Sequence, residues 1–128
     1  MEIFKIKEQK VDLEDATGNL KSAILSYIPF VNLIPYFKKT DSPFVEFHAK
    51  EGVTLFIIEI LYGVLSLIFT RIKVVTCSWG ICEKHTPLYI TIPLLIILIV
   101  LLTLNIIGIY NVITKKQRSL PVIGNIFE

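Results

Sequence analysis

The sequence PLYITIPLLIILIVLLTLNIIGIYNVIT, residues 87–114, decides the fold, because these 28 residues include no charged side chain. In an α-helix they would extend about 42 Å at 1.5 Å per residue, which exceeds the roughly 30 Å of hydrocarbon in a bilayer. The centre of this stretch is apolar on every side, so lipid or other helices must surround it. We therefore predict a membrane-spanning helix here, kinked at Pro93.

A second long apolar stretch, GVTLFIIEILYGVLSLIFT at residues 52–70, has one ionisable side chain, Glu59. Its 19 residues are close to the length that a spanning helix needs. The helix can begin before this stretch, at Pro43 with Ser42 as its N-cap, so we predict a span over about 44–70. Two such spans predict an all-α integral membrane protein.

The first apolar segment, residues 20–37, is too short for the same assignment. Its uncharged part, residues 22–37, would form only about 24 Å of helix, and Pro29 and Pro35 interrupt the hydrogen bonding. Two alternatives stay open: a short, proline-kinked span, or a re-entrant segment that dips into one leaflet and returns. The predicted fold is thus a small bundle of two transmembrane helices and this third apolar segment.

These three segments form one predicted membrane domain, residues 20–116. A polar tail (1–19) precedes it, and an amphiphilic tail (117–128), which is too short to span, follows it. We expect the second tail to lie along the interface or against the bundle. The loop at 71–86 connects the two long spans.

Basic residues set the orientation of a membrane protein, because the cytoplasmic side carries more of them. A spanning first segment would divide the basic residues seven against six, which decides nothing. In either case we place Lys38, Lys39 and the cluster at 115–118 in the cytoplasm and the loop 71–86 outside, in a multi-pass protein of the cell (cytoplasmic) membrane. A re-entrant first segment would divide them ten against three, as Lys5, Lys7, Lys10, Lys21, Lys38, Lys39, Lys50, Lys115, Lys116 and Arg118 against Arg71, Lys73 and Lys84.

Composition and charge argue against several classes of function. Hydrophobic residues make up 53% of the chain and the mean hydropathy is +0.66, with the charges gathered in a few clusters. A net charge of +2 on scattered basic residues does not form the continuous stripe that binding of nucleic acid requires. The sequence also lacks an evident nucleophile with its base, a phosphate-binding glycine loop and paired catalytic carboxylates, so we expect neither an enzyme nor a cofactor.

Glu59 is the most informative single residue, because a carboxyl group in mid-span costs a few kcal/mol unless it is protonated, paired or facing water. At helical spacing it belongs to a small, polar stripe that we expect to face the other segments. We favour packing, with Glu59 protonated or bonded to Asn105 or Asn32, over an ion or proton relay. The candidates for helix packing and intramembrane polar contacts are Asn32, His48, Gly52, Glu59, Gly63, Ser66, Asn105 and Gly108.

Neither the histidines nor the cysteines indicate a metal site. His48 and Glu51 lie one turn apart, but zinc needs three or four ligands, and we expect His85 on the other side of the membrane. Cys77 and Cys82 have a spacing that is typical of neither redox nor zinc sites. They form either a disulfide, if the loop lies in an oxidising compartment, or two free thiols.

Three features in a fixed order resemble one protein family: SYIPFVNLIPYFKKTDSPFVEFHAKEG, an apolar span, and a last span that ends in GIYNVITKKQRSLPVIGNIF. The chain resembles the Tic-twenty-like family of small prokaryotic membrane proteins, related to a component of chloroplast inner-envelope protein import. This resemblance implies a link to protein translocation or membrane-protein assembly. The residues that carry it are Phe44, Phe47, His48, Glu51, Gly52, Lys115, Lys116, Leu120 and Pro121.

Together these observations predict a non-enzymatic accessory or scaffold subunit of a membrane complex. It would lie in the lipid bilayer and pair with another membrane protein or with copies of itself. The alternative is a small self-assembling channel or transporter, in which several copies surround a polar path lined by Glu59, Ser66 and Thr70.

Overall fold

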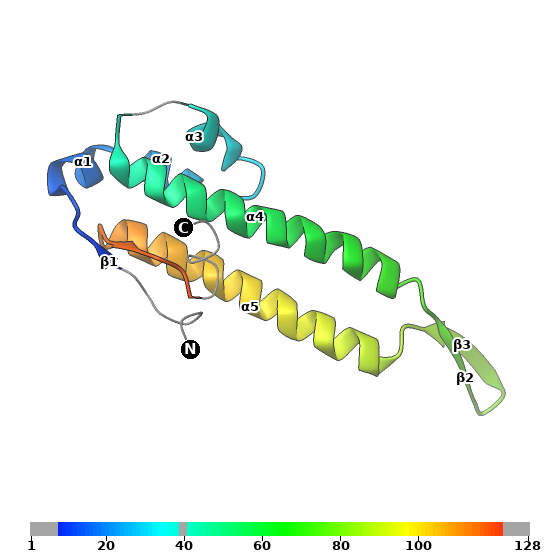
Figure 1. Ribbon diagram of the computed structural model, residues 1–128. Coiled ribbons are helices and arrows are strands. Elements are labelled where there is room, and N and C mark those ends of the chain that lie inside the picture. Colours follow the sequence, from blue (N-terminus) through cyan, green and yellow to red (C-terminus); the bar gives the residue numbers. More distant parts are fainter. Residues whose placement is uncertain (1–7, 39–40, 122–128) are drawn as a thin grey trace.

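Two long helices dominate the computed structural model, which describes residues 8–38 and 41–121. Helices α4 (Pro43–Phe69) and α5 (Leu88–Ile113) lie side by side and run in opposite directions (Figure 1). Both are long and apolar enough to cross a membrane. Large hydrophobic side chains are exposed along both helices, as contact with lipid requires. We therefore treat α4 and α5 as the two spans.

Local sequence accounts for the start of α4. Helix α4 begins where the sequence predicted, because Pro43 occupies the first turn and the Ser42 hydroxyl accepts the Val45 amide hydrogen at 3.2 Å. Helix α5 contains Pro93 in its first half. Close to that proline, the hydroxyl of Tyr62 donates to the carbonyl oxygen of Leu94 at 3.0 Å, which connects α4 to α5.

Short elements gather around the first half of α4 and the last half of α5. They are α1 (Leu13–Gly18), α2 (Leu20–Leu25) and α3 (Leu33–Phe37), together with β1 (Glu8–Gln9), which pairs antiparallel with β4 (Gln117–Arg118) (Figure 1). We call this the packed end of the molecule. At the opposite end, the hairpin end, β2 (Val74–Ser78) pairs with β3 (Ile81–His85). These strands and α1 differ from the prediction of an all-α bundle with a polar tail at 1–19.

The first apolar segment does not cross the molecule. Its two helices, α2 and α3, both contact the first half of α4, so the chain dips beside α4 and returns to the packed end. This path is the one that the re-entrant alternative describes, and we call residues 20–37 the re-entrant segment. This path places the described basic residues Lys10, Lys21, Lys38, Lys50, Lys115, Lys116 and Arg118 at the packed end and Arg71, Lys73 and Lys84 at the hairpin end.

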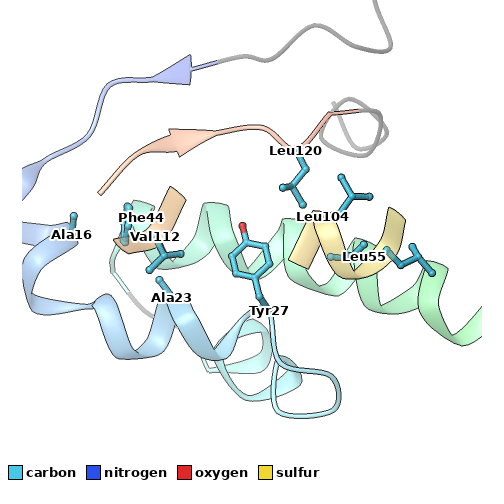
Figure 2. Packing of buried hydrophobic residues seen from close by; sticks show 9 residues of the cluster. Ala16, Ala23, Tyr27, Phe44, Leu55, Leu104, Val112 and Leu120 are labelled. Atoms are coloured by element: carbon cyan, nitrogen blue, oxygen red, sulfur yellow. The ribbon is translucent and has the colours of Figure 1, made fainter. Parts of the chain in front are cut away.

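The hydrophobic core lies at the packed end (Figure 2). Tyr27 from the re-entrant segment lies between the two long helices, where a Cβ on Gly108 would be 2.2 Å from its ring. A Cβ on Gly52 would be 1.7 Å from the carbonyl oxygen of Ser26. The segment can dock this closely only because both helices carry glycine there. The buried cluster comprises Ala16, Ala23, Tyr27, Phe44, Leu55, Leu101, Leu104, Val112 and Leu120.

Candidate functional site

A buried polar cluster lies at the packed end, centred on His48, which has no exposed surface. Its Nε2 atom lies 3.1 Å from the carbonyl oxygen of Lys116, and its Nδ1 atom lies 2.7 Å from the hydroxyl of Tyr27. Because a carbonyl oxygen can only accept, Nε2 carries the proton of a neutral ring, and Nδ1 accepts from Tyr27. His48 thus connects the re-entrant segment, α4 and the chain that follows α5.

Three more side chains make hydrogen bonds that hold the same elements together. Both carboxylate oxygens of Glu51 accept the amide hydrogen of Leu120, at 3.1 Å each. The side-chain amide of Gln117 donates to the carbonyl oxygen of Pro43 at 3.2 Å, and that of Asn32 donates to Gly52 at 3.1 Å. Apart from the Asn32 amide oxygen, which is buried without a partner, these polar groups are hydrogen-bonded within the protein, so the cluster holds the packed end together.

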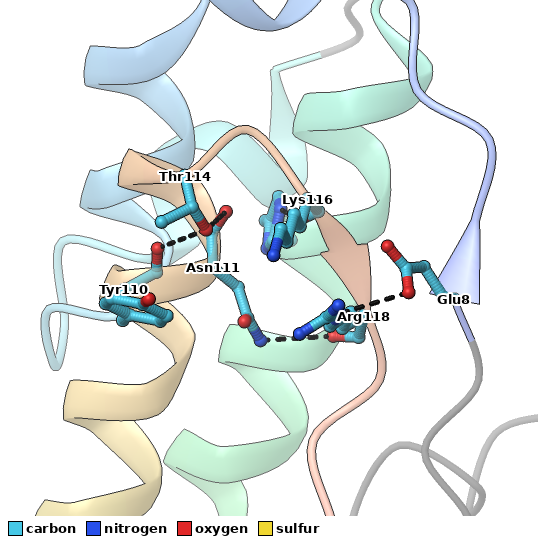
Figure 3. A network of polar contacts seen from close by, with 7 residues as sticks. Glu8, Tyr110, Asn111, Thr114, Lys116 and Arg118 are labelled. Atoms are coloured by element: carbon cyan, nitrogen blue, oxygen red, sulfur yellow. Dashed lines mark hydrogen bonds and ion pairs between the residues drawn. The ribbon is translucent and has the colours of Figure 1, made fainter.

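The chain turns sharply after α5 and runs back along α4 (Figure 3). Lys115 adopts a positive φ of 56°, and Asn111 then donates to the carbonyl oxygen of Arg118 at 3.4 Å. The guanidinium of Arg118 pairs with Glu8 of β1 at 3.2 Å. The described part of the C-terminal tail, up to Pro121, therefore folds against the bundle, while residues 122–128 of the predicted amphiphilic tail lie outside the described residues.

In mid-span, Glu59 of α4 faces Asn105 of α5. The Asn105 amide donates to the Glu59 carboxylate and to the Leu101 carbonyl oxygen, the latter at 3.2 Å. Asn105 is one of the two amide partners that the sequence suggested for Glu59, whereas Asn32 bonds Gly52 instead. The carboxyl group is half-buried, and Asn105 is a partner for it within this chain.

The stripe beyond Glu59 packs less closely than its composition suggested. A Cβ on Gly63 would meet no atom within 4 Å, so the expectation of close helix contact at Gly63 is wrong within this chain. The hydroxyl of Ser66 donates to the Gly63 carbonyl oxygen at 2.9 Å, and that of Thr70 donates to Ser66 at 2.7 Å. Both hydroxyls thus have acceptors within their own helix, so neither requires a polar path around it.

The hairpin is exposed along almost its whole length. Cys77 and Cys82 lie directly opposite each other in β2 and β3 and are joined by a disulfide. Trp79 and Gly80 form the tip with φ of 53° and 80°, and Trp79 is 99% exposed. Both positive φ values match the two-residue turn that suits a right-handed hairpin. The covalent bridge beside this turn fixes its shape.

Directly paired residues share one face of a hairpin, and successive residues alternate between faces. Thr76 pairs with Glu83 and Ser78 with Ile81, so these side chains and that of His85 lie on one face. Val75 and Lys84 lie on the other face with the disulfide. The first face also carries Val74 and Ile81, and it presents a carboxylate, an imidazole and two hydroxyl groups that are all exposed.

Among residues 8–38 and 41–121, no group of three or more His, Cys, Asp or Glu side chains could hold a metal ion. His48 and His85 lie at opposite ends of the molecule. The candidate functional surface is the exposed hairpin face that carries Thr76, Ser78, Glu83 and His85, which we call the polar face, and not Glu59 as the sequence suggested. The available signal was the alternation of side chains between two faces along residues 74–85, but the faces can be assigned only once the strand register is known.

Comparison with known proteins places this arrangement in one family. The model of the magnetosome magnetite crystal formation protein family, MamF/MmsF, matches residues 16–127. No curated protein and no solved structure matches the chain significantly. The match overturns the resemblance to the Tic-twenty-like family, and with it the implied link to protein translocation. The residues behind that resemblance, such as His48, Glu51 and Gly52, serve packing at the membrane surface, which carries no information about transport.

Proposed function

The chain belongs to the magnetosome magnetite crystal formation protein family, and on that premise we propose that it is a non-enzymatic scaffold that holds its hairpin, residues 71–86, against the growing magnetite crystal. The magnetosome membrane, in which proteins of this family lie, is an invagination of the cytoplasmic membrane. The lumen of such an invagination corresponds to the outside of the cell. A crystal within it would meet whatever the protein presents on the outer side.

One observation carries the proposal: the element beyond the spans at the hairpin end is closed by a disulfide between Cys77 and Cys82. Disulfides persist in oxidising compartments, and the outside of the cytoplasmic membrane is one. The distribution of basic residues supports the same orientation, with the packed end in the cytoplasm. Both arguments favour a hairpin that faces the lumen.

The chemistry of the polar face suits a mineral that contains iron and oxygen. Glu83 and His85 supply a carboxylate and an imidazole, which are common ligands of iron, and Thr76 and Ser78 supply hydroxyl groups that hydrogen-bond to oxide. A surface ion needs fewer protein ligands than an enclosed site, because the crystal supplies the rest. The disulfide and the tight turn hold these groups in one arrangement and so reduce the entropy lost on binding.

We further propose that the protein acts in numbers, with another membrane protein or with copies of itself, because one hairpin covers little of a crystal face. The rival function, a self-assembling channel lined by Glu59, is disfavoured by the bond between Glu59 and Asn105 and by the internal bonds of Ser66 and Thr70. These groups have partners in the monomer.

The test is magnetite precipitation in the presence of the protein in lipid nanodiscs, which expose both ends. Intact mass two hydrogens below that of the reduced chain would first verify the bridge. Crystals grown with the wild type should have a narrower size distribution than crystals grown with empty nanodiscs. The double variant E83Q/H85Q should lose this effect, because its polar face no longer offers the carboxylate and imidazole.

The matched control is Lys84→Gln, which changes a neighbouring side chain on the opposite face of the same strand. It should act on crystals like the wild type. If the double variant and the control behave alike, the polar face is not the contact surface. If the wild type behaves like empty nanodiscs, the scaffold proposal itself fails.

A further inference from the structure

The two ends of the molecule occupy very different areas of membrane. At the hairpin end the bilayer holds α4 and α5 alone, whereas at the packed end the re-entrant segment, residues 20–37, lies beside them (Figure 1). An α-helix with its side chains is about 10 Å across, so two further short helices add substantially to the cross-section there. The described part of the protein is therefore a wedge in the membrane.

The depth of the re-entrant segment follows from its contacts with α4. About 20 residues of helix cross the hydrocarbon, so a span that ends at Phe69 enters it near Lys50. Phe30, at the bottom of the dip, packs edge-on against Phe56 with ring centroids 5.1 Å apart. Phe56 lies about 9 Å below that entry point, by the rise of an α-helix, which is more than half of the roughly 15 Å depth of one leaflet.

The outward side chains of this segment are apolar, as contact with lipid requires. Phe30 is 75% exposed, Phe37 73% and Ile34 59%. Lys21 and Lys38 border the segment on both sides, where they reach the headgroups. Tyr36 and, on α5, Tyr110 are exposed at the same end, as aromatic residues are at a membrane interface.

We propose that the re-entrant segment is a curvature-sensing wedge, whose partner is the leaflet at the packed end of a bent bilayer. A protein that displaces more lipid in one leaflet lies with least strain where that leaflet is on the convex side. The protein therefore concentrates where the membrane bends away from the packed end. This inference does not depend on what the hairpin binds.

The experiment uses the complete chain in vesicles of pure phosphatidylcholine, about 50 nm or about 400 nm in diameter, because interfacial insertion depends on curvature. Lysines report orientation without any tag. A membrane-impermeant amine reagent labels Lys116 in copies with the packed end outward and Lys84 in copies with the hairpin outward. Mass spectrometry of both peptides then measures the orientation ratio.

The ratio of packed end outward to hairpin outward should be at least about twofold higher in the small vesicles, a modest population shift. In the triple variant F30A/I34A/F37A the ratio should become independent of diameter, because the wedge is thinner while the segment stays apolar. The matched variant L61A/L67A/I92A removes exposed side chains from the other half of the spans. It should keep the dependence on diameter or increase it.

Phe30→Gly is a control for misfolding of the triple variant, because Phe30 has a positive φ of 66° that glycine adopts without strain. This variant removes the deepest ring and relaxes the backbone, so it should stay folded and weaken the dependence. An orientation ratio that is independent of diameter in the wild type would overturn the proposal. The exposed apolar surface of the re-entrant segment would then be a binding surface for a protein partner. Equal losses in both triple variants would also overturn the proposal, since they would reflect apolar area rather than shape.

Discussion

The two halves of α4 are parts of one continuous helix, yet they are stabilised in different ways. In the first half, at the packed end, α1, α2, α3 and β4 lie against α4 in addition to α5, and His48, Gly52 and Leu55 are buried. In the second half, α5 is the main neighbour, Leu67 is largely exposed and Gly63 has open space beside it. The first half therefore depends on protein contacts, while the second depends on lipid.

This difference teaches that composition alone does not locate the packing face of a membrane helix. Gly52 and Gly63 belong to the same stripe of small and polar residues. Only Gly52 is a site of close approach, because only there does a re-entrant backbone lie against the helix. Small residues permit close contact, but a neighbour has to be present to use it.

The largest expected effect separates these two glycines. In Gly52→Ala the new methyl group would overlap the carbonyl oxygen of Ser26, which is backbone and cannot rotate away. We expect a loss of about 3 kcal/mol or more in the free energy of unfolding, at the upper end for overpacked sites. Gly63→Ala should instead be neutral or stabilise the helix by up to about 1 kcal/mol, because alanine has the higher helix propensity.

Thermal unfolding of both variants in the same mild detergent measures the comparison. The helix content of Gly52→Ala should also fall at temperatures where α4 and α5 are still intact, because the re-entrant segment detaches first. Equal stability of the two variants would show that the close contact at Gly52 does not exist in the folded protein.

A smaller effect is expected at Glu51, which binds the backbone of the C-terminal segment. In Glu51→Ala the amide hydrogen of Leu120 stays buried without its acceptor, which costs roughly 1–3 kcal/mol. Glu51→Gln keeps one acceptor oxygen and should lose less than Glu51→Ala. Limited proteolysis after Lys116 should report the release of this segment, with cleavage fastest in Glu51→Ala, slower in Glu51→Gln and slowest in the wild type.

Resistance of all three proteins to cleavage would mean that other contacts suffice to hold the segment. Gln117, which donates to the Pro43 carbonyl oxygen, is the first such contact to remove. A double variant of Glu51→Ala and Gln117→Ala then distinguishes a redundant attachment from one that does not involve Glu51.

The sequence predicted the parts of the fold that depend on a single element. Charge-free length identified α5, and the Ser42 and Pro43 pair located the start of α4, because both signals are local. The re-entrant segment was one of two alternatives, since proline spacing limits a helix without saying where the chain goes next. Its position follows from Tyr27 meeting Gly108 and from Ser26 meeting Gly52, contacts between residues far apart in sequence.

The candidate site was harder to predict for the same reason. Glu59 stands out in a sequence because a charge in mid-span is rare, whereas Thr76, Ser78, Glu83 and His85 are ordinary loop residues. They form a surface only through strand pairing and the disulfide that fixes it. The pairing of β1 with β4 likewise depends on distant partners, such as Arg118 for Glu8, whereas α1 begins at a local N-cap, Asp12.

Curvature connects the two ends of the molecule. An invagination of the cytoplasmic membrane has its cytoplasmic leaflet on the convex side, which is the side that the wedge prefers when the packed end faces the cytoplasm. In that orientation the hairpin projects into the lumen. A single shape would thus bring the protein to the invagination and point its polar face inward.

The smallest expected effect is at Glu59, where the two halves of α4 meet. Glu59→Gln keeps an oxygen that accepts the Asn105 amide hydrogen, so the free energy of unfolding in detergent should change by less than about 1 kcal/mol. Glu59→Leu removes the acceptor, while Asn105 keeps its bond to the Leu101 carbonyl oxygen, so its loss should be larger than that of Glu59→Gln. Proton and cation flux into liposomes should be equally absent from the wild type and Glu59→Gln, because the carboxylate is engaged by its own chain. Flux that the wild type supports and Glu59→Gln abolishes would contradict this prediction. The charge of Glu59 would then be its functional property, and Glu59 would line a path between several copies of the protein.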